Sequence, residues 1–381
     1  MAGIVGIGSP NKHEIVRSML DKIAYRGKSG KEIFSNDYYT LGIIWNACEW
    51  DNVLQNIVKV KLADSGNNYR LAEANIDGKE IFLTRDKLGI APLYYGYNYF
   101  GELCFASEVK ALINNVSIVT ELLPGSVFNG KKQEKVYNLN HREHFNIDIE
   151  IIAKDLYRLL DKSIYRSVSF DSIGAWLSGG LDSSTISAIA RKYVTKLHTF
   201  AAGMKGAPDF EYAREVAKHI ASEHHEIVVS LKEMIHALPE VIYHLESFDA
   251  LLVRSSIINY LATKEASNYI NEVFSGEAGD ELFAGYAYLK NLQENQLENE
   301  LIDITERLHN TALQRVDRCS AAFGIIPHVP FADPEVFEYA LSIPIKYKLY
   351  NGIEKWILRK AIEKELPEKV LNRPKAKFWE G

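Results

Sequence analysis

The stretch Ser172-Ile-Gly-Ala-Trp-Leu-Ser-Gly-Gly-Leu-Asp-Ser-Ser184 decides the fold. Ile173 to Leu177 is an apolar run with the length of a buried strand. Ser178–Gly180 follows as a glycine turn, and Ser183 and Ser184 are residues of the kind that begin a helix. The stretch therefore predicts a strand, a tight turn and a helix in succession.

The same turn predicts a binding site. Gly179 and Gly180 let the backbone approach a ligand closely, and free N–H groups at the helix start favour an anion. Asp182 would repel a bare phosphate unless a metal ion lay between them, so the turn favours a magnesium complex of a nucleotide or of pyrophosphate. An ordinary strand-to-helix turn is the alternative, but Ser-Gly-Gly-x-Asp-Ser is much rarer than Gly-Gly alone. It is not the Gly-x-x-x-x-Gly-Lys-Ser/Thr loop of kinases and GTPases.

Composition excludes several classes of protein. The 381 residues allow two domains, and 47% hydrophobic with 25% charged residues is ordinary for a globular chain. The net charge of −6 and the lack of a long basic run argue against nucleic acid. No stretch approaches a membrane span or a secretory signal, and three scattered cysteines indicate neither a disulfide framework nor a metal site. We expect a cytoplasmic protein that binds neither nucleic acid nor membrane.

The pattern of elements changes along the chain. Residues 1–148 have the β-rich character of one domain, and the polar stretch 138–146 is the expected linker. In residues 149–381, helices alternate with short strands, which indicates a parallel sheet with helices on both faces. Ligands bind at the carboxyl ends of such strands, and Leu177, Ala202 and Phe274 are expected there. Residues 289–313 are rich in charge and predict a solvated helical insert.

Matches along the chain identify a family. The Ser-Gly-Gly-Leu-Asp-Ser183 turn resembles the pyrophosphate loop of the ATP pyrophosphatases, which cleave ATP between the α and β phosphates. Nearly the whole chain resembles asparagine synthetases of the glutamine-hydrolysing type. The resemblance implies an N-terminal Ntn-hydrolase α+β sandwich and a C-terminal doubly wound parallel sheet. The N-terminal matches are Gly3-Ile-Val-Gly6, Tyr25-Arg-Gly27, Arg85-Asp-Lys-Leu-Gly-Ile-Ala-Pro-Leu-Tyr-Tyr95, Phe105-Ala-Ser-Glu-Val-Lys-Ala111 and Leu123-Pro-Gly-Ser126.

The N-terminal domain departs from the family at its active site. Family glutaminases carry a cysteine nucleophile directly after the initiator methionine, where this chain has Ala2. The segment from Gly30 to Asn75 is short and lacks the two family stretches that hold glutamine. Alanine is also a common deliberate replacement for a catalytic cysteine, but the parallel loss of the pocket favours natural decay. We expect no glutaminase activity.

The C-terminal domain keeps more of the family's site. The resemblance implies that Asp182 and Asp280 bind Mg²⁺, that Glu277 accepts a proton from the attacking amine, and that Lys355 stabilises charge as pyrophosphate leaves. Glu277 and Asp280 belong to Ser275-Gly-Glu-Ala-Gly-Asp-Glu281, which resembles the family's Ser-Gly-Glu-Gly-Ser-Asp-Glu. The implied ATP contacts are Leu177, Ser178, Gly179, Gly180, Leu181, Asp182, Ser183, Ala202, Gly203, Ser275 and Gly276.

The substrate segment is less similar. Phe248-Asp-Ala-Leu-Leu-Val-Arg254 stands where relatives carry Tyr-Asp-Val-Thr-Thr-Ile-Arg, so the resemblance places Asp249, Leu251, Leu252 and Arg254 near the substrate. Arg254 could clamp a carboxylate, whereas two leucines in place of threonines remove hydrogen-bond partners. A bulkier or less polar acid than aspartate is therefore plausible. Arg373 to Phe378 resembles the mobile tail loop of the family.

These features together predict an ATP-dependent amide-forming ligase. It would activate a small carboxylic acid as an acyl-adenylate, with ATP and Mg²⁺, for attack by ammonia or an amine. One alternative is a specialised amide-forming or ring-forming ligase of the β-lactam synthetase type, which also lacks the glutaminase nucleophile. The other is a non-catalytic nucleotide-binding scaffold, against which the retention of Asp182, Glu277, Asp280 and Lys355 argues. A homodimer is possible.

Overall fold

The chain forms two compact units. The computed structural model describes residues 2–46, 61–65, 69–77, 79–140 and 142–375. Unit 1 comprises Met1–Asn138 together with two short later segments, His244–Glu246 and Asp317–Ile326, and unit 2 holds the remainder. The division at Asn138 and Leu139 falls at the start of the expected linker, before the boundary at residue 148 that the sequence suggested. The two later segments of unit 1 had no signal in the sequence.

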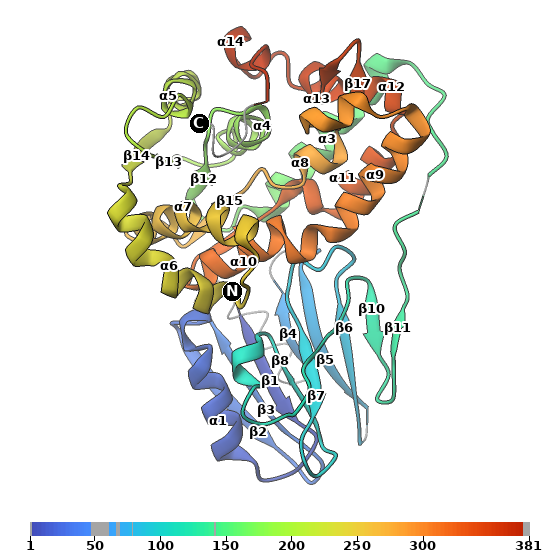
Figure 1. Cartoon of the computed structure of the whole chain (residues 1–381), viewed down its shortest axis with the longest axis vertical. Helices are drawn as coiled ribbons and strands as arrows, with labels where there is room; N and C mark the ends of the chain where they lie inside the picture. The colour runs from blue at the N-terminus through green and yellow to red at the C-terminus, as the bar shows by residue number, and fades with distance from the viewer. Residues whose placement is uncertain (1, 47–60, 66–68, 78, 141, 376–381) are drawn as a thin grey trace. The chain divides into compact units, whose positions relative to one another are not determined.

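Unit 1 contains two antiparallel sheets (Figure 1), as the predicted α+β sandwich requires. One has the strand order β2-β3-β1-β8-β7-β9 and the other β11-β10-β6-β5-β4. The strands are β1 (Gly3–Ile7), β2 (Gly30–Ser35), β3 (Thr40–Trp45), β4 (Lys61–Ser65), β5 (Leu71–Asp77), β6 (Glu80–Arg85), β7 (Tyr94–Tyr97), β8 (Leu103–Ala106), β9 (Thr120–Glu121), β10 (Ser126–Phe128) and β11 (Gln133–Lys135).

Apolar layers hold unit 1 together. Ile4, Leu41 and Leu83 belong to one buried cluster that joins the two sheets. Helix α1 (His13–Lys22) buries Val16 and Leu20 in a second cluster that also contains β1 and β8 residues. A short 3₁₀ turn, Val109–Ala111, follows β8.

A buried charge cluster ties the later segments of unit 1 to its N-terminal motifs. The Arg26 guanidinium lies 2.8 Å from Glu108 and 3.0 Å from Asp317. Arg318 lies 3.1 Å from both Glu108 and Glu246. Burial alone would raise the pKa of Glu108, but the cations of Arg318, Lys110 and Arg26 hold it well below its usual range. The Tyr25-Arg-Gly27 and Ser107-Glu-Val-Lys110 motifs therefore have a structural role as partners in this cluster.

Unit 2 is built on the predicted parallel sheet, with the strand order β14-β13-β12-β15-β16. β12 pairs in parallel with both β13 and β15, and β13 pairs in parallel with β14. The strand order reverses direction between β12 and β15, which is the position where doubly wound sheets bind ligands. The strands are β12 (Ser172–Trp176), β13 (Lys196–Gly203), β14 (Glu223–Val228), β15 (Glu272–Phe274) and β16 (Ile326–His328), with a separate hairpin of β17 (Leu349–Tyr350) and β18 (Ile353–Glu354).

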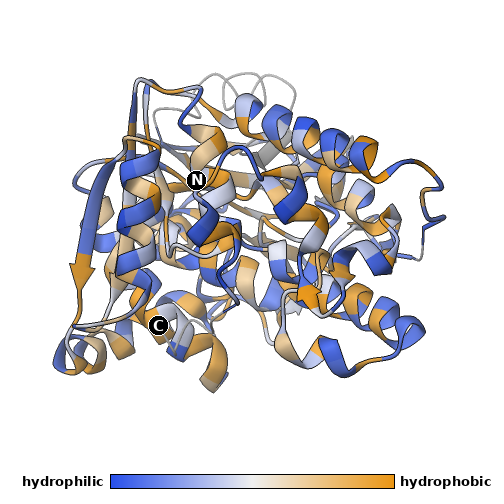
Figure 2. Ribbon diagram, turned by 90° about the horizontal axis from the view of Figure 1, so that it is seen from above, coloured by the Kyte–Doolittle hydropathy of each residue, from blue (hydrophilic) through white to orange (hydrophobic). Residues whose placement is uncertain are grey.

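The helices of unit 2 lie before, between and after these strands along the chain, singly or in runs of two or three. Their ribbons in Figure 2 carry both orange hydrophobic and blue hydrophilic residues, as expected for helices with one buried side. They are α3 (Ile149–Ser167), α4 (Leu181–Ala190), α5 (Asp209–His219), α6 (Leu231–Leu245), α7 (Ala250–Ala266), α8 (Gly279–Leu282), α9 (Glu294–Glu306), α10 (Ala312–Ala321), α11 (Pro334–Ser342), α12 (Ile345–Lys348), α13 (Trp356–Ala361) and α14 (Glu368–Leu371).

The interpretation of residues 289–313 as a solvated insert was wrong. The segment is helical, but Leu297 and Leu301 of α9 are each only 2% exposed and pack with Leu289 and Ile345. Residues four apart lie on the same face of a helix, so the charged residues between them conceal an apolar face.

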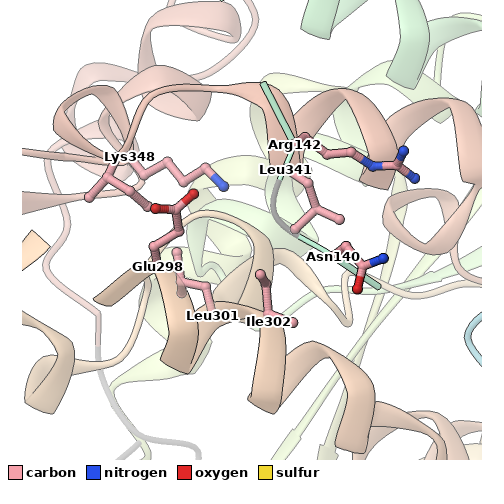
Figure 3. A pocket seen from close by; sticks show the side chains of 8 residues that line it. Asn140, Arg142, Glu298, Leu301, Ile302, Leu341 and Lys348 are labelled. Atoms are coloured by element: carbon pink, nitrogen blue, oxygen red, sulfur yellow. The ribbon is translucent and has the colours of Figure 1, made fainter. Parts of the chain in front are cut away.

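The apolar face of α9 also lines a small pocket (Figure 3). The buried amine of Lys348 enters it near the carboxylate of Glu298. Burial lowers the pKa of Lys348 to about 7, against the opposing effect of Glu298.

No helix in the described part of the chain is both long enough and apolar enough to span a membrane.

Candidate active site

The turn that follows β12 is shaped by glycine and serine. Gly179 has φ of +69°, and a β-carbon there would lie 2.4 Å from Cβ of Tyr212, so only glycine fits against α5. The Ser178 and Ser183 hydroxyls are hydrogen-bonded at 3.1 Å, and Ser183 Oγ accepts from the Ser178 amide. The turn thus presents its backbone at the start of α4, as the sequence predicted, although the helix begins at Leu181 rather than at Ser183.

The acidic turn leaves the neighbouring strand. β15 ends at Phe274, and the Ser275 amide donates to His328 O, which fixes the start of the turn. Asp280 and Glu281 follow in the short helix α8. Because β12 and β15 are adjacent and parallel, the glycine turn and the acidic turn leave the same edge of the sheet.

Three charged side chains meet between these turns. The Lys355 amine donates to Asp182 Oδ2 and lies 2.5 Å from Asp280 Oδ1. Lys355 is 2% exposed and has φ of +55°, outside the usual helical range, at the residue before α13. Burial raises the pKa of Asp182, whereas the cations of Lys355 and Lys375 outweigh burial at Asp280 and lower its pKa.

Glycines leave the space that these side chains fill. A β-carbon on Gly279 would lie 2.6 Å from Asp182 Oδ1, and one on Gly285 would lie 2.0 Å from Asp280 Oδ1. The preceding Ala278 has φ of +75°, a left-handed conformation that favours glycine. The acidic turn is therefore packed directly against the carboxylate of Asp182.

The residues present fit a magnesium ion. Asp182 Oδ1 is buried and has no hydrogen-bond partner in the described part of the chain. Asp182 and Asp280 supply the hard carboxylate oxygens that Mg²⁺ prefers, and nearby phosphate oxygens could complete such a site.

Arg373 and Lys375, at the end of the described residues, contact the glycine turn and the acidic turn. The Arg373 guanidinium lies 4.0 Å from the centre of the Tyr212 ring and donates to Ser178 O at 3.1 Å. The Lys375 amine donates to Asp280 Oδ2 at 2.5 Å. Residues 376–378 of the expected tail loop lie outside the described residues.

Glu277 lies in the turn before α8 and is bound by a side chain of helix α10. Its Oε1 accepts a hydrogen bond of 2.6 Å from Arg315 of α10, and Arg315 also donates to Ser255 Oγ of α7 at 2.9 Å. The next acid, Glu281, accepts from the Tyr286 hydroxyl at 2.5 Å, and burial together with Asp280 raises the pKa of Glu281 to about 7. The two glutamates of one turn therefore have different environments, because one is paired with a guanidinium and the other is buried.

The residues expected near the substrate lie at or after the start of α7. Asp249 caps the helix by accepting from the Leu252 amide at 2.7 Å. Leu251 is 66% exposed, whereas Leu252 is 6% exposed, so the two leucines lie in different environments. Arg254 is exposed on the helix. Ala202 and Gly203 lie at the carboxyl end of β13, the position expected for contact with a nucleotide.

Sequence reasoning missed several residues of this site. Arg315 lies in α10 without any motif, and its role is visible only from its contact with Glu277. Lys375 was noted only as part of the tail. Gly285 carried a weak signal as an isolated glycine that closely follows the acidic turn.

Comparisons with known proteins agree with this geometry. The asparagine synthase family matches residues 155–311 and 293–381, and a glutamine amidotransferase domain matches residues 69–142. A solved NMN synthetase from Francisella tularensis is 14% identical over 62% of this chain and 94% of its own, but its TM-score of 0.27 is too low to bear on the assignment.

Several asparagine synthetases are similar to this chain over most of its length. Asparagine synthetase [glutamine-hydrolyzing] 2 of Arabidopsis thaliana is 30% identical over 98% of this chain and 66% of its own length. The Bos taurus asparagine synthetase [glutamine-hydrolyzing] is 34% identical over 94% and 68%, and asparagine synthetase B of Escherichia coli is 36% identical over 78% and 58%. The chain thus spans about two thirds of the length of the Arabidopsis thaliana and Bos taurus proteins, and 58% of the length of the Escherichia coli protein. On these matches, the chain belongs to the asparagine synthase family.

Proposed function

We propose that this protein is an ATP-dependent ligase that converts a carboxylic acid into an amide, with AMP and pyrophosphate as the other products. The observation that carries the proposal is the meeting of Asp182, Asp280 and Lys355 at the strand-order reversal of the sheet. Two acids and a buried lysine beside a glycine turn suit the binding and cleavage of a nucleoside triphosphate. The family membership of the chain supports the same chemistry.

The first step would make an acyl-adenylate. A carboxylate oxygen of the acid attacks the α phosphorus of ATP, and the bond to the β phosphate oxygen breaks to release pyrophosphate. Lys355 would stabilise the negative charge that develops on the phosphates. Asp182 and Asp280 would hold Mg²⁺, which neutralises phosphate charge when bound.

The second step would form the amide. Ammonia or an amine attacks the acyl carbon. The bond between that carbon and the phosphate oxygen breaks, and AMP leaves with the electron pair of this bond. Glu277 would take the proton from the attacking nitrogen. Arg315 orients the Glu277 carboxylate through the 2.6 Å hydrogen bond, so it is a positioning residue for this step.

The nitrogen source would be free ammonia or an amine rather than glutamine. Ala2 is 1% exposed and offers no nucleophile where glutaminases of the family carry cysteine. Part of the segment from Gly30 to Asn75, where the family holds glutamine, lies outside the described residues.

The acid would carry a carboxylate that Arg254 can bind. Aspartate is the first choice because of the family, but exposed Leu251 favours an acid with an apolar part over a purely polar one. The same observation keeps a ring-forming ligase of the β-lactam synthetase type as the second candidate, in which the attacking amine belongs to the activated acid itself.

Pyrophosphate release tests the proposal. The protein is incubated with ATP, Mg²⁺, ammonium and a panel of carboxylic acids that includes aspartate and amino acids with apolar side chains. We expect release that depends on the acid and is lost in Asp182→Ala but kept in His236→Gln, a change at an exposed residue of α6. No acid-dependent release across the panel would refute the ligase. Equal amide formation with glutamine in place of ammonium would refute the loss of the glutaminase.

A further inference from the structure

A second cluster of polar side chains lies away from the site just described, on the two outermost strands on one side of the unit 2 sheet (Figure 1). His198 of β13 and Glu223 of β14 are register partners, and His225 follows two residues later on the same face. Nδ1 of His198 lies 2.9 Å from Nε2 of His225 and 3.6 Å from Oε2 of Glu223. One donor atom from each of the three residues lies within 4.8 Å of the other two.

These distances are close to those of a metal centre. A tetrahedral zinc ion with bonds of about 2.0–2.1 Å to nitrogen places two ligand atoms about 3.3 Å apart. The two imidazoles would need to separate by only a few tenths of an ångström, and the Glu223 carboxylate is near enough to become the third ligand. We propose that His198, Glu223 and His225 form a binding site for a divalent transition-metal ion, with Zn²⁺ the best fit, and with a fourth position open to water.

The surroundings favour neutral imidazoles, which is the state that binds metal. His198 is 4% exposed, and the rings of Phe200 and Tyr269 pack beside the two histidines, with the Tyr269 ring centre 4.4 Å from that of His225. Burial lowers the pKa of both His198 and His225. Two imidazoles and one carboxylate suit Zn²⁺ better than Mg²⁺, which prefers an all-oxygen site.

One positive group competes for the carboxylate. The Lys196 amine lies 2.9 Å from Oε2 of Glu223, the same oxygen that faces His198. A bound ion would share or displace this ion pair. Both partners of the pair are about half exposed, so it is a weak competitor.

The site is distinct from the ligase centre. His198 lies four residues before Ala202, or about 13 Å along an extended strand, toward the opposite end of the sheet. A bound ion would link β13 to β14, which is an edge strand of the sheet, and would stabilise the pairing of these two strands. The proposal therefore does not depend on the proposed function.

Zinc binding to the full chain tests the inference. Equilibrium dialysis against Zn²⁺, with Mg²⁺ in excess to occupy the carboxylate site, should give close to one zinc ion per chain. Binding should weaken at least tenfold in His225→Gln and in Glu223→Gln, and should be unchanged in His236→Gln. Zn²⁺ should also raise Tm in the wild-type protein but not in His225→Gln.

Cobalt provides a readout that does not depend on stability. Co²⁺ bound by two imidazoles and a carboxylate in a near-tetrahedral site gives strong visible absorption, which should appear in the wild-type protein and be absent from Glu223→Gln. Because the Glu223 side chain is about half exposed, this variant should fold normally. Wild-type protein that binds no zinc in excess Mg²⁺, or binding that survives in both His225→Gln and Glu223→Gln, would overturn the proposal.

Discussion

The amine of Lys355 lies 2.5 Å from Oδ1 of Asp280 and also donates to Asp182, a residue 173 positions earlier in the sequence. This buried lysine is shared by two carboxylates, which lie just after two adjacent strands of the sheet. The same carboxylates are the proposed magnesium ligands, so the lysine and a metal ion act on the same negative charge.

Removing that amine should affect both activity and stability. We expect Lys355→Met to reduce pyrophosphate release at least about 100-fold, the usual effect of losing one group that stabilises transition-state charge. Without Mg²⁺ its Tm should fall, because Asp182 and Asp280 lose their shared cation, and Mg²⁺ should restore more of the Tm than it adds to the wild type. Lys364→Met, a change at an exposed lysine, is the control. Unchanged turnover in Lys355→Met would remove this lysine from the mechanism.

Substitutions at two neighbouring residues of the acidic turn should have opposite effects. Ala278→Gly should be neutral or stabilising by up to about 1 kcal/mol, since it relieves a left-handed conformation. Gly279→Ala should lower pyrophosphate release by tenfold or more, because the new methyl group would lie 2.6 Å from Asp182 Oδ1. Urea unfolding and the pyrophosphate assay measure the two effects. If Gly279→Ala keeps full activity, the close packing of this turn against Asp182 has no role in the reaction.

The charge cluster of unit 1 should control its stability in acid. Glu108→Gln should cost roughly 3 kcal/mol, because Arg26 and Arg318 would be left buried without their anion. The folded-state pKa of Glu108 lies below its ordinary value of 4.5, so its contribution is present above that pH and is lost as the pH falls. Denaturant unfolding between pH 7 and 3 should show a smaller acid-dependent loss in Glu108→Gln than in the wild type. Glu134→Gln, which breaks an exposed ion pair with Lys132, should cost well under about 1 kcal/mol.

Lys348 should also make the wild-type protein more stable as the pH rises, but at higher pH than Glu108, because a destabilising charge is lost. Its pKa of about 7 lies below the ordinary 10.5, so the cost of burying its charge is greatest below pH 7, shrinks as the pH rises and disappears near pH 10.5. Lys348→Met should therefore stabilise unit 2 at pH 6 to 7, by up to roughly 5 kcal/mol, and by less at pH 9. The measurement is urea unfolding at each pH, with exposed Lys346→Met as the control. A stabilisation independent of pH would mean that Lys348 is not buried as a perturbed amine in the pocket of Figure 3.

The sequence determined the local chemistry of the chain. The run from Ser172 to Ser184 specified the strand, the turn and the helix, because glycine conformation and helix-start preferences are local properties. Alternating helices and strands indicated the parallel sheet, and the motifs indicated the family, which the comparisons confirm. The proposed roles of Glu277, Lys355 and the other site residues stay predictions for the experiments above.

Tertiary structure alone decided which of these residues meet. Asp182, Asp280 and Lys355 converge because β12 and β15 are neighbours in the sheet, a fact that depends on strand order and not on any local pattern. The contact of Arg315 with Glu277, the burial of α9 and the His198–His225 pair also arise between distant segments. Side-chain contacts of this kind depend on how elements pack, and packing is a property of the whole chain. The sequence therefore supplied the charged groups, and the fold decided which of them share one site.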